Sequence, residues 1–316
     1  MDLEQIATTL DNSDNYRVIR KYQKPNYYHT PDNNTKILIG VFLDIESTGL
    51  SAADDKLIEL GMVKFEYSMD GRIFRILDEF NQYQDPCQPI SQFITKLTGI
   101  NNQMVQNKKI DPVQVAAYLA KVDLIIAHNA SFDRVFFEKS FPTLPPIAWA
   151  CSMHDINWSG ENIESLKLEY IAYKYNVFYE GHRAITDCLV GIHLLAQQLY
   201  NSKKFALKQL LDNALQPRFQ LWAKGAPYEH KDILKSRKYR WNTHPVDNFK
   251  SWTIQLPQNQ VEDEINFLKN EIYNHTMNIP FDIFDAYSRF SSKYIPSAVS
   301  DTHRHLEKWV QELQYR

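Results

Sequence analysis

The sequence predicts an α/β fold: a mixed β-sheet with helices on both faces, followed by a small α+β module towards the C-terminus. Residues 37–50 (ILIGVFLDIESTGL) begin with an apolar, β-branched run that indicates a buried strand. Two more such runs, 58–67 and 73–83, flank the turn 69–72, whose Asp-Gly pair is a strong hairpin signal. A fourth apolar run begins at residue 124 and leads through a polar turn into a helical pattern. Strands and helices in this order are typical of a sheet covered by helices.

The remaining elements divide the chain into segments. A helix is expected from Pro112, because proline fits the first helical turn. A short strand is expected at 147–150, with helices at 164–175 and 184–199, and 204–215 resembles a connecting helix. The predicted segments are an N-terminal extension lying over the main domain (1–37), the main domain (38–200), a linker helix (201–217), a small basic and aromatic accessory module (218–275) and a helical tail (276–316).

Composition limits the class of protein. The 316 residues are 44% hydrophobic, which is enough for one large core and a smaller unit. No apolar stretch is long enough to cross a bilayer and the N-terminus does not resemble a signal peptide, so we expect a cytoplasmic protein that does not contact membranes. The formal net charge of -3 is not that of a protein that coats nucleic acid broadly, although local basic patches could still bind phosphates. The three cysteines show neither metal-knuckle nor disulfide spacing.

The first strand places two carboxylates on one face. Because side chains alternate along a strand, Phe42, Asp44 and Glu46 share a face. Two acids side by side on an apolar strand repel each other and resist desolvation unless a cation neutralises them. This pair therefore indicates a divalent metal site at the end of the strand, where open α/β sheets usually bind ligands.

Two later segments add two acids and a histidine. Asp133 lies in the opening turn of the helix after residue 124, and His182 precedes Asp187 by five residues at the start of another helix. Gly191 falls one turn after Asp187, and glycine in a helix costs ~1 kcal/mol relative to alanine, so we expect a close approach to the sheet there. Taken singly, the acids could merely favour the helix dipole and the histidine could lie on the surface. The joint pattern favours a single site.

Three motifs resemble those of the DEDDh family of DnaQ-like 3′–5′ exonucleases, which includes polymerase III epsilon-type proofreading subunits, RNase T and oligoribonuclease. DIESTGL is similar to the family's DxETTGL, with Ser47 in place of the first threonine; AHNASFD is similar to the second motif; and HRAITD, with Ala184, is similar to HxAxxD. ITKLTGI resembles the helix and turn that connect the first two motifs. The resemblance covers about residues 38–200 and implies an RNase H-like sheet.

The resemblance also implies roles for single residues. Asp44 would bridge two Mg²⁺ ions, for which Mn²⁺ could substitute, with Glu46 and Asp187 completing the shell of one ion and Asp133 acting on the other. His182 would be the general base. Further residues would bind the terminal nucleotide or orient the site: Thr48, Gly49, Leu50, His128, Asn129 and Phe132. For these six, a tight turn, a helix cap or core packing is the alternative reading.

The implied activity is removal of nucleoside monophosphates from the 3′ end of DNA, with single-stranded or frayed ends favoured. The same site could instead serve an exoribonuclease of the oligoribonuclease type. An alternative of another class is a non-catalytic nucleic-acid-binding or polymerase-associated module. DNA polymerase or DNA repair proteins are the expected protein partners, since the chain has no polymerase motif of its own.

The accessory module combines basic and aromatic residues. Between Lys224 and Lys250, seven cations stand against three acids, a local net charge of +4, interleaved with Tyr228, Tyr239, Trp241 and Trp252. Such a composition is typical of surfaces that bind single-stranded nucleic acid. The alternative is that the tryptophans form the core of a small domain, which we expect for at least one of them.

Overall fold

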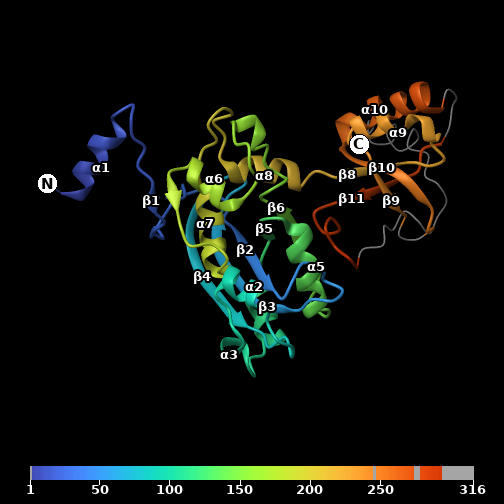
Figure 1. Ribbon diagram of the computed structural model, residues 1–316. Coiled ribbons are helices and arrows are strands. Elements are labelled where there is room, and N and C mark those ends of the chain that lie inside the picture. The colour runs from blue at the N-terminus through green and yellow to red at the C-terminus, as the bar shows by residue number, and fades with distance from the viewer. Residues whose placement is uncertain (1, 245–246, 274–277, 294–316) are drawn as a thin grey trace. The chain divides into compact units, whose positions relative to one another are not determined.

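The computed structural model describes residues 2–244, 247–273 and 278–293 (Figure 1). The chain divides into two compact units, Met1–Asn213 and Ala214–Arg316. Each unit is considered separately below.

The first unit is built on a mixed five-stranded sheet in the order β4-β3-β2-β5-β6. Its strands are β2 (Leu38–Ser47), β3 (Leu57–Tyr67), β4 (Ile73–Tyr83), β5 (Leu124–Ala127) and β6 (Ala148–Cys151). Strands β2, β3 and β4 pair antiparallel, whereas β2, β5 and β6 pair parallel. The predicted mixed sheet and the hairpin between β3 and β4 are therefore confirmed.

Helices cover this sheet. Helix α7 (Ala184–Leu195) packs across β2, β3 and β4, and α5 (Ala130–Ser140) packs against β2, β5 and β6. A β-carbon on Gly191 would lie 2.3–2.8 Å from ring atoms of Phe42, so the expected close approach of α7 to β2 is confirmed. The other helices of this part of the unit are α2 (Gln92–Thr98), α3 (Asn102–Val105), α4 (Pro112–Leu119), the 3₁₀ turn η1 (Ser159–Glu161) and α6 (Leu168–Lys174).

The N-terminal extension pairs with the first unit through one short strand. It contains α1 (Leu3–Asp11) and β1 (Arg20–Lys21), and β1 pairs in parallel with β7 (Val177–Phe178). Helix α1 buries none of its own residues.

The predicted linker helix is instead a packed part of the first unit. In α8 (Ala206–Ala214), one face is buried, including Leu207, Leu210 and Leu211. The Gln209 side chain accepts a hydrogen bond from the backbone of Asn157 at 2.6 Å. The apolar period of α8 drives this packing, because an amphipathic helix buries its apolar stripe wherever a partner surface exists.

The second unit contains a four-stranded antiparallel sheet in the order β11-β8-β10-β9. Its elements are β8 (Arg218–Ala223), η2 (Tyr228–His230), α9 (Lys231–Ser236), β9 (Arg240–Thr243), β10 (Lys250–Pro257), η3 (Gln258–Gln260), α10 (Val261–Phe267), the π-helical turn η4 (Leu268–Tyr273) and β11 (Phe281–Phe284). The predicted helical tail is wrong at β11, which pairs with β8 and extends the sheet beyond residue 275. The rest of that prediction, from residue 294, lies outside the described residues.

Candidate active site

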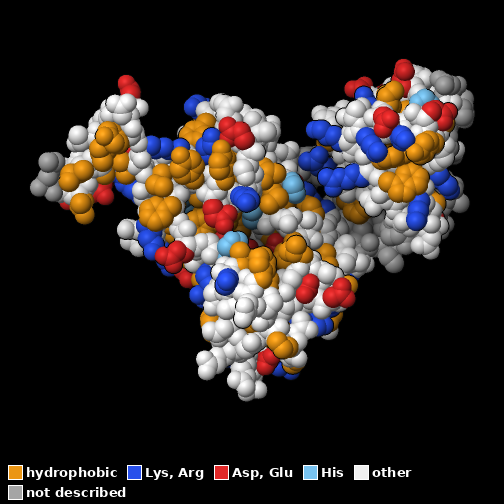
Figure 2. All heavy atoms as spheres, in the orientation of Figure 1, with side chains coloured by type: hydrophobic (Ala, Val, Ile, Leu, Met, Phe, Trp, Pro, Cys, Tyr) orange, Lys and Arg blue, Asp and Glu red, His pale blue; other side chains and the backbone are white. Residues whose placement is uncertain are grey.

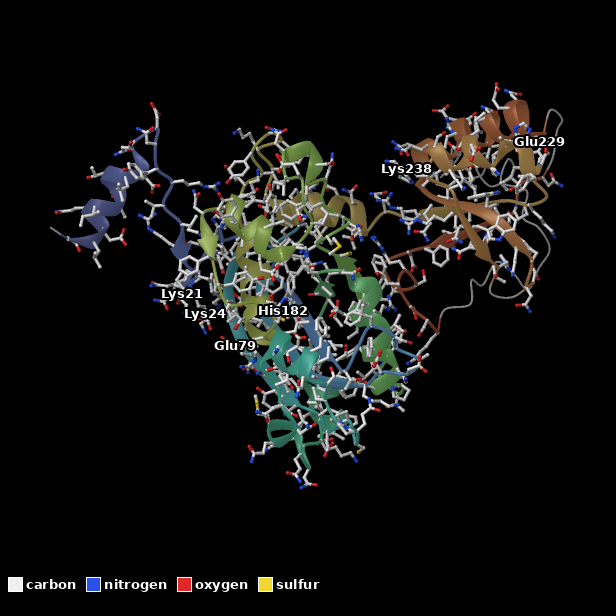
Figure 3. All side chains as sticks on the ribbon, in the orientation of Figure 1. Lys21, Lys24, Glu79, His182, Glu229 and Lys238 are labelled. Carbon is white, nitrogen blue, oxygen red and sulfur yellow. The ribbon has the colours of Figure 1, made fainter. Side chains whose placement is uncertain are left out.

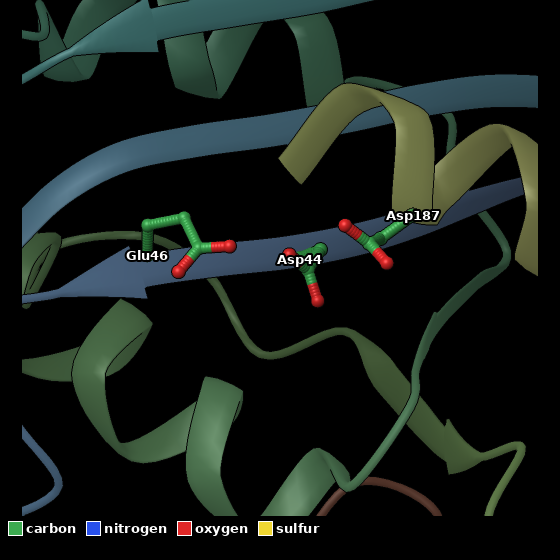
Figure 4. Close-up of side chains that lie close together, drawn as sticks. All are labelled: Asp44, Glu46 and Asp187. Carbon is green, nitrogen blue, oxygen red and sulfur yellow. The ribbon is translucent and has the colours of Figure 1, made fainter. Parts of the chain in front are cut away.

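Three carboxylates converge at the end of β2. Alternation along the strand brings Asp44 and Glu46 to the face that α7 covers, and α7 supplies Asp187 from its first turn. One carboxylate oxygen from each of the three lies within 4.8 Å of the others (Figure 4). Carboxylate oxygens are the ligands that Mg²⁺ and Mn²⁺ prefer.

Asp133 reaches the same place from α5 but stands slightly apart. Its Oδ1 accepts a hydrogen bond from the backbone N–H of Ile45 at 3.2 Å, which fixes α5 against the strand that carries the other acids. Asp133 is buried and does not belong to the group of three carboxylates within 4.8 Å.

Burial and mutual repulsion disfavour the charged forms of these acids. Burial, followed by the charges of Asp187 and Asp133, raises the pKa of Asp44 well above its usual value. Burial and Asp187 raise the pKa of Glu46 to about 8, while Arg183 opposes this shift. Burial also raises the pKa of Asp187 to about 6 and that of Asp133 well above its usual value. A site that resists four negative charges in this way is suited to divalent cations, which would remove the repulsion.

His182 lies beside the acids on an exposed, left-handed turn. Its φ is +62°, and its Nε2 lies 3.6 Å from Oε1 of Glu169. A β-carbon on the preceding Gly181 would lie 2.8 Å from the same Oε1, so glycine leaves the room that the Glu169 carboxylate occupies. The Glu169 carboxylate therefore faces the imidazole, although no feature of the sequence singled it out.

These groups line one cavity of about 330 Å³. Its wall contains Asp44, Ile45, Glu46, His128, Phe132, Asp133, Lys167, Leu168, Glu169, His182 and Asp187. All five predicted catalytic residues are thus brought to one cavity. Lys167 is the only lysine or arginine among the described residues of that wall, which makes it a ready contact for a phosphate.

The predicted nucleotide-binding residues behave in two ways. His128 and Phe132 line the cavity, whereas its described wall does not include Thr48, Gly49, Leu50 or Asn129. The Thr48 hydroxyl is engaged within its own loop, where it donates to Asp55 at 3.0 Å, and Leu50 is 87% exposed.

His128 is held by both ring nitrogens. Nε2 lies 2.7 Å from the carbonyl oxygen of Leu166, and Nδ1 lies 2.9 Å from the hydroxyl of Ser152. Burial lowers its pKa to about 4, so the ring is neutral near pH 7, with Nε2–H donating to the carbonyl and Nδ1 accepting from the hydroxyl. His128 thus joins β5 to the segment before α6 and orients the wall.

Three more residues support the acids and were not predicted. Glu59 on β3 lies opposite Glu46 in the strand register, is fully buried, and accepts hydrogen bonds from Asn81 and the backbone of Ala184. Arg183 donates to the Tyr83 hydroxyl at 2.6 Å and approaches Glu59 at 3.4 Å. The signal for Glu59 was present, since an acid interrupts the apolar run of β3.

Tyr179 is the third of these residues. Its hydroxyl donates to Oδ1 of Asp187 at 2.9 Å, while the backbone N–H of Arg183 donates to Oδ2 at 3.0 Å. These two donors fix the Asp187 carboxylate and lower its pKa against the effect of burial. No sequence pattern marked Tyr179, because a tyrosine in a loop has many ordinary uses.

A mixed sheet that presents clustered carboxylates and a histidine in one cavity defines a phosphodiesterase of the nuclease class. Residues 41–195 match the RNase T family, described as "Exonuclease". These residues form an exonuclease domain of the DEDDh family of DnaQ-like 3′–5′ exonucleases.

Similar proteins include bacterial polymerases. A DNA polymerase III PolC-type from Caldanaerobacter subterraneus subsp. tengcongensis is 29% identical over 214 residues, 65% of this chain and 15% of that polymerase. The PolC-type polymerase of Bacillus subtilis (strain 168) is 30% identical over 167 residues, 50% of this chain and 11% of that polymerase. The chain thus corresponds to only a small part of these relatives.

Solved structures with a similar fold were also found. E. coli Exonuclease I in complex with a dA16 oligonucleotide is 13% identical, with a TM-score of 0.48, over 74% of this chain and 71% of that chain. The nuclease domain of 3'hExo, a DEDDh family member bound to rAMP, is 18% identical, with a TM-score of 0.41, over 51% of this chain and 91% of that chain. Within the described residues, no helix has both the length and the apolar character needed to cross a membrane.

Proposed function

We propose that this protein removes nucleoside monophosphates from the 3′ end of DNA, with single-stranded or frayed ends favoured. The observation that carries the proposal is the meeting of Asp44, Glu46 and Asp187 within 4.8 Å of one another in a cavity that His182 also lines. A carboxylate cluster with a histidine at its edge is suited to hydrolysis of a phosphodiester by an activated water.

The acids fit two divalent cations, Mg²⁺ or Mn²⁺. Asp44, Glu46 and Asp187, whose carboxylate oxygens lie within 4.8 Å of one another, would hold one ion, and Asp44 and Asp133 would hold the other. When bound, such a pair supplies water activation and stabilises charge on the attacking and leaving oxygens.

The surrounding residues perform the remaining tasks. His182 accepts the proton of the attacking water, and the Glu169 carboxylate 3.6 Å away stabilises the imidazolium that results. Tyr179 holds Asp187 in place through its hydroxyl. Lys167 contacts a phosphate of the strand that enters the cavity, and Phe132 and Leu50 pack against the terminal base or sugar.

DNA is the proposed substrate because the similar curated proteins are named as DNA polymerases. Association with a DNA polymerase or with DNA repair proteins is part of the same proposal. The chain corresponds to 15% or less of the length of those two polymerases. A cytoplasmic location also stays a prediction.

A nuclease assay with end-labelled strands tests the proposal. Single-stranded and duplex DNA and RNA, labelled at the 5′ end, are incubated with the full chain in Mg²⁺, Mn²⁺ or chelator. We expect a ladder shortened from the 3′ end of single-stranded DNA, with no reaction in chelator. Faster shortening of RNA would favour the exoribonuclease alternative. No cleavage of any strand, in either metal, would favour a non-catalytic module.

A further inference from the structure

Exposed cations lie on the β9 side of the second unit, although the first turn of α9 also carries Asp232. Four exposed cations lie on or beside α9, β9 and β10, namely Lys235, Lys238, Arg240 and Lys250. The first turn of α10 instead carries Glu262, Asp263 and Glu264. Figure 2 shows Lys and Arg side chains gathered on one side of this unit, and Figure 3 shows Lys238 and Glu229 at opposite sides of it.

Three other cations of the unit contact neighbouring side chains of the same unit. Arg237 forms a two-pronged ion pair with Glu264 and lies 3.9 Å from the centre of the Phe267 ring. Lys224 lies over the ring of Phe249, and Lys231 contacts Tyr228. By contrast, Lys235, Lys238, Arg240 and Lys250 form no ion pair with any residue that the structure describes.

An exposed tryptophan, Trp241, lies on the strand that carries Arg240 and pairs with the strand that carries Lys250. Strand β9 forms the edge of the sheet, and all four of its residues are exposed. Trp241 is 56% exposed, and one edge of it packs against Trp252, with ring centres 5.5 Å apart and planes at 70°. The strand register puts Lys250 on the same face as Trp241 and puts Arg240 on the other face of the same edge.

Core packing does not require this tryptophan. The core of the unit already contains Phe219, Leu221, Leu234 and Tyr239, and Trp252 packs against it. Cations on an edge strand can serve simply to prevent pairing with other sheets, but a large exposed aromatic ring does not help in that role. Lys238, moreover, precedes the edge strand and has a φ of +70° after α9, a position that glycine would occupy with less strain.

We propose that the β9 edge surface, formed by Lys235, Lys238, Arg240, Trp241 and Lys250, binds single-stranded nucleic acid. The four cations contact successive phosphates, and a base stacks on the open part of the Trp241 ring. Bases of a single strand are free to stack in this way, whereas those of a duplex are not. The inference rests on the proposed function only in taking a polynucleotide as the ligand.

Binding by the full chain to a closed circle of single-stranded DNA tests the inference. The circle has no 3′ end for the active-site cavity, and chelator prevents cleavage, so fluorescence anisotropy reports binding alone. Lys238→Gly/Arg240→Gln removes two phosphate contacts. We expect it to weaken binding and to reduce the slope of log affinity against log salt by about 1.4, that is, ~0.7 for each contact on a single strand. Trp241→Ala should weaken binding roughly 5- to 150-fold.

The first unit offers a matched control. Lys121 also has a left-handed φ, +64°, and Lys36 is exposed, both near the ends of β2 and β5 that lie away from the acids. Lys121→Gly/Lys36→Gln removes the same charge and should leave strand binding unchanged. In both double variants, glycine replaces a lysine whose backbone is in the left-handed region, which removes backbone strain. Neither double variant should therefore melt at a lower temperature than the parent. If Trp241→Ala lowers the melting temperature, the folded variant Lys238→Gly/Arg240→Gln still tests the surface.

Three results would overturn the inference. The first is that the parent protein does not bind the circle. The second is that Lys238→Gly/Arg240→Gln and Trp241→Ala, the two surface variants, bind it as tightly as the parent. The third is that the control Lys121→Gly/Lys36→Gln loses as much affinity as the surface variants do. Equal binding by the surface variants would leave a protein partner as the better occupant of this edge. If the parent protein binds the circle but cleaves no strand, only the proposed function is contradicted. The two failures are therefore distinguishable.

Discussion

At the scale of single residues, Asp44 is the group most crowded by like charge. Its neighbours Asp187, Asp133 and Glu46 all act against its ionisation. Because Asp44 is the proposed ligand of both metal ions, Asp44→Asn should reduce nuclease activity to background. It should also keep or raise the melting temperature of the metal-free protein, because it removes a buried negative charge from a repelling cluster. Differential scanning fluorimetry in chelator and the end-labelled strand assay measure the two effects.

Asp14→Asn is the control for this prediction, since Asp14 is an exposed acid of the N-terminal extension. Neither activity nor melting temperature should change in it. Substantial activity in pure Asp44→Asn protein would show that the cluster has been wrongly assigned as the reaction centre.

A second prediction concerns His182 and the carboxylate that faces it. His182→Ala should lower kcat by ~10²–10⁴, the usual contribution of a general base, and the pH–rate profile should lose the limb that reports protonation of that base. Glu169→Gln should lower kcat by less, because Glu169 acts only through the imidazole 3.6 Å away.

The double variant distinguishes positioning from independent catalysis. If Glu169 acts through His182, then Glu169→Gln should have almost no further effect in a His182→Ala background. Additive losses would mean that Glu169 touches substrate or metal by itself. Near-normal kcat in His182→Ala would make the histidine a structural residue.

The sequence located the candidate catalytic residues better than the residues that support them. Asp44, Glu46, Asp133, His182 and Asp187 fall in motifs with fixed spacing, and all five line one cavity. The residues that support these groups lie elsewhere. Glu59 is on the neighbouring strand β3 and Tyr179 is in a loop. Arg183 is within the third motif, at a position where the motif specifies no residue type. Their roles depend on distances between segments far apart in the chain, which no local pattern contains.

At the scale of secondary-structure elements, the packing of α7 on β2 is set by one glycine. A β-carbon on Gly191 would lie 2.3 Å from the Phe42 ring, and Phe42 is fully buried. Overpacking should cost ~1–3 kcal/mol, whereas alanine gains ~1 kcal/mol over glycine in a helix, so Gly191→Ala should destabilise the protein by up to ~2 kcal/mol. Urea denaturation followed by circular dichroism measures the change.

Phe42→Leu tests the cause of that loss. Alone, the smaller side chain leaves a cavity and is destabilising. Combined with Gly191→Ala, it removes the clash and accepts the new methyl group, so the double variant should be more stable than the sum of the single changes by ~0.5–3 kcal/mol. Strict additivity would show that the helix has moved away from the strand instead.

The elements that could be predicted are those with a clear period. The hairpin β3–β4 follows from strand runs around Asp70 and Gly71, and α4 begins at Pro112 as expected. The segment at β11 was assigned to a helix because Phe281 and Phe284 are three residues apart. Their alternation with Asp282 also fits a strand, and pairing with β8 decides the outcome. Four-residue segments carry too little pattern to exclude either structure.

At the scale of the whole molecule, the division into two units separates chemistry from the proposed strand surface. All five predicted catalytic residues belong to the unit Met1–Asn213, and the β9 edge surface belongs to the unit Ala214–Arg316. The boundary lies later than the end of the predicted main domain, because α8 has an apolar stripe that the first unit buries. Sequence patterns locate such a stripe but not the surface that will bury it.

We expect the acidic cluster to make the stability of the protein depend on pH and on divalent cations. The pKa of Glu46 is raised to about 8 in the folded protein, against 4.5 for an ordinary glutamate. A carboxyl whose pKa is raised by folding stabilises the folded state below its unfolded pKa, and this contribution is lost as pH rises through the folded value. Metal-free protein should therefore lose stability between pH 6.5 and pH 8, a window bounded by the Glu46 value.

This window avoids an opposing contribution. The pKa of His128 is lowered to about 4, so that residue destabilises the folded state only as pH falls below the ordinary histidine value of 6.5. Above pH 6.5 the loss of stability should come from the acids. Glu46→Gln, which cannot ionise, should flatten the curve of melting temperature against pH in chelator.

Divalent cations should oppose the loss of stability that metal-free protein shows as pH rises. Ions that bind only the folded state stabilise it by ~2.7 kcal/mol at a hundred times their Kd. Protons compete with them for carboxylates whose pKa values lie near 6 and 8, so Mg²⁺ should raise the melting temperature more at pH 8 than at pH 6. In Glu46→Gln the increase at pH 8 should shrink, whereas in Asp14→Asn it should match the parent. A melting temperature of metal-free protein that rises from pH 6.5 to pH 8, or an Mg²⁺ effect that is larger at pH 6, would show that the carboxylates are already neutralised by other groups of the chain.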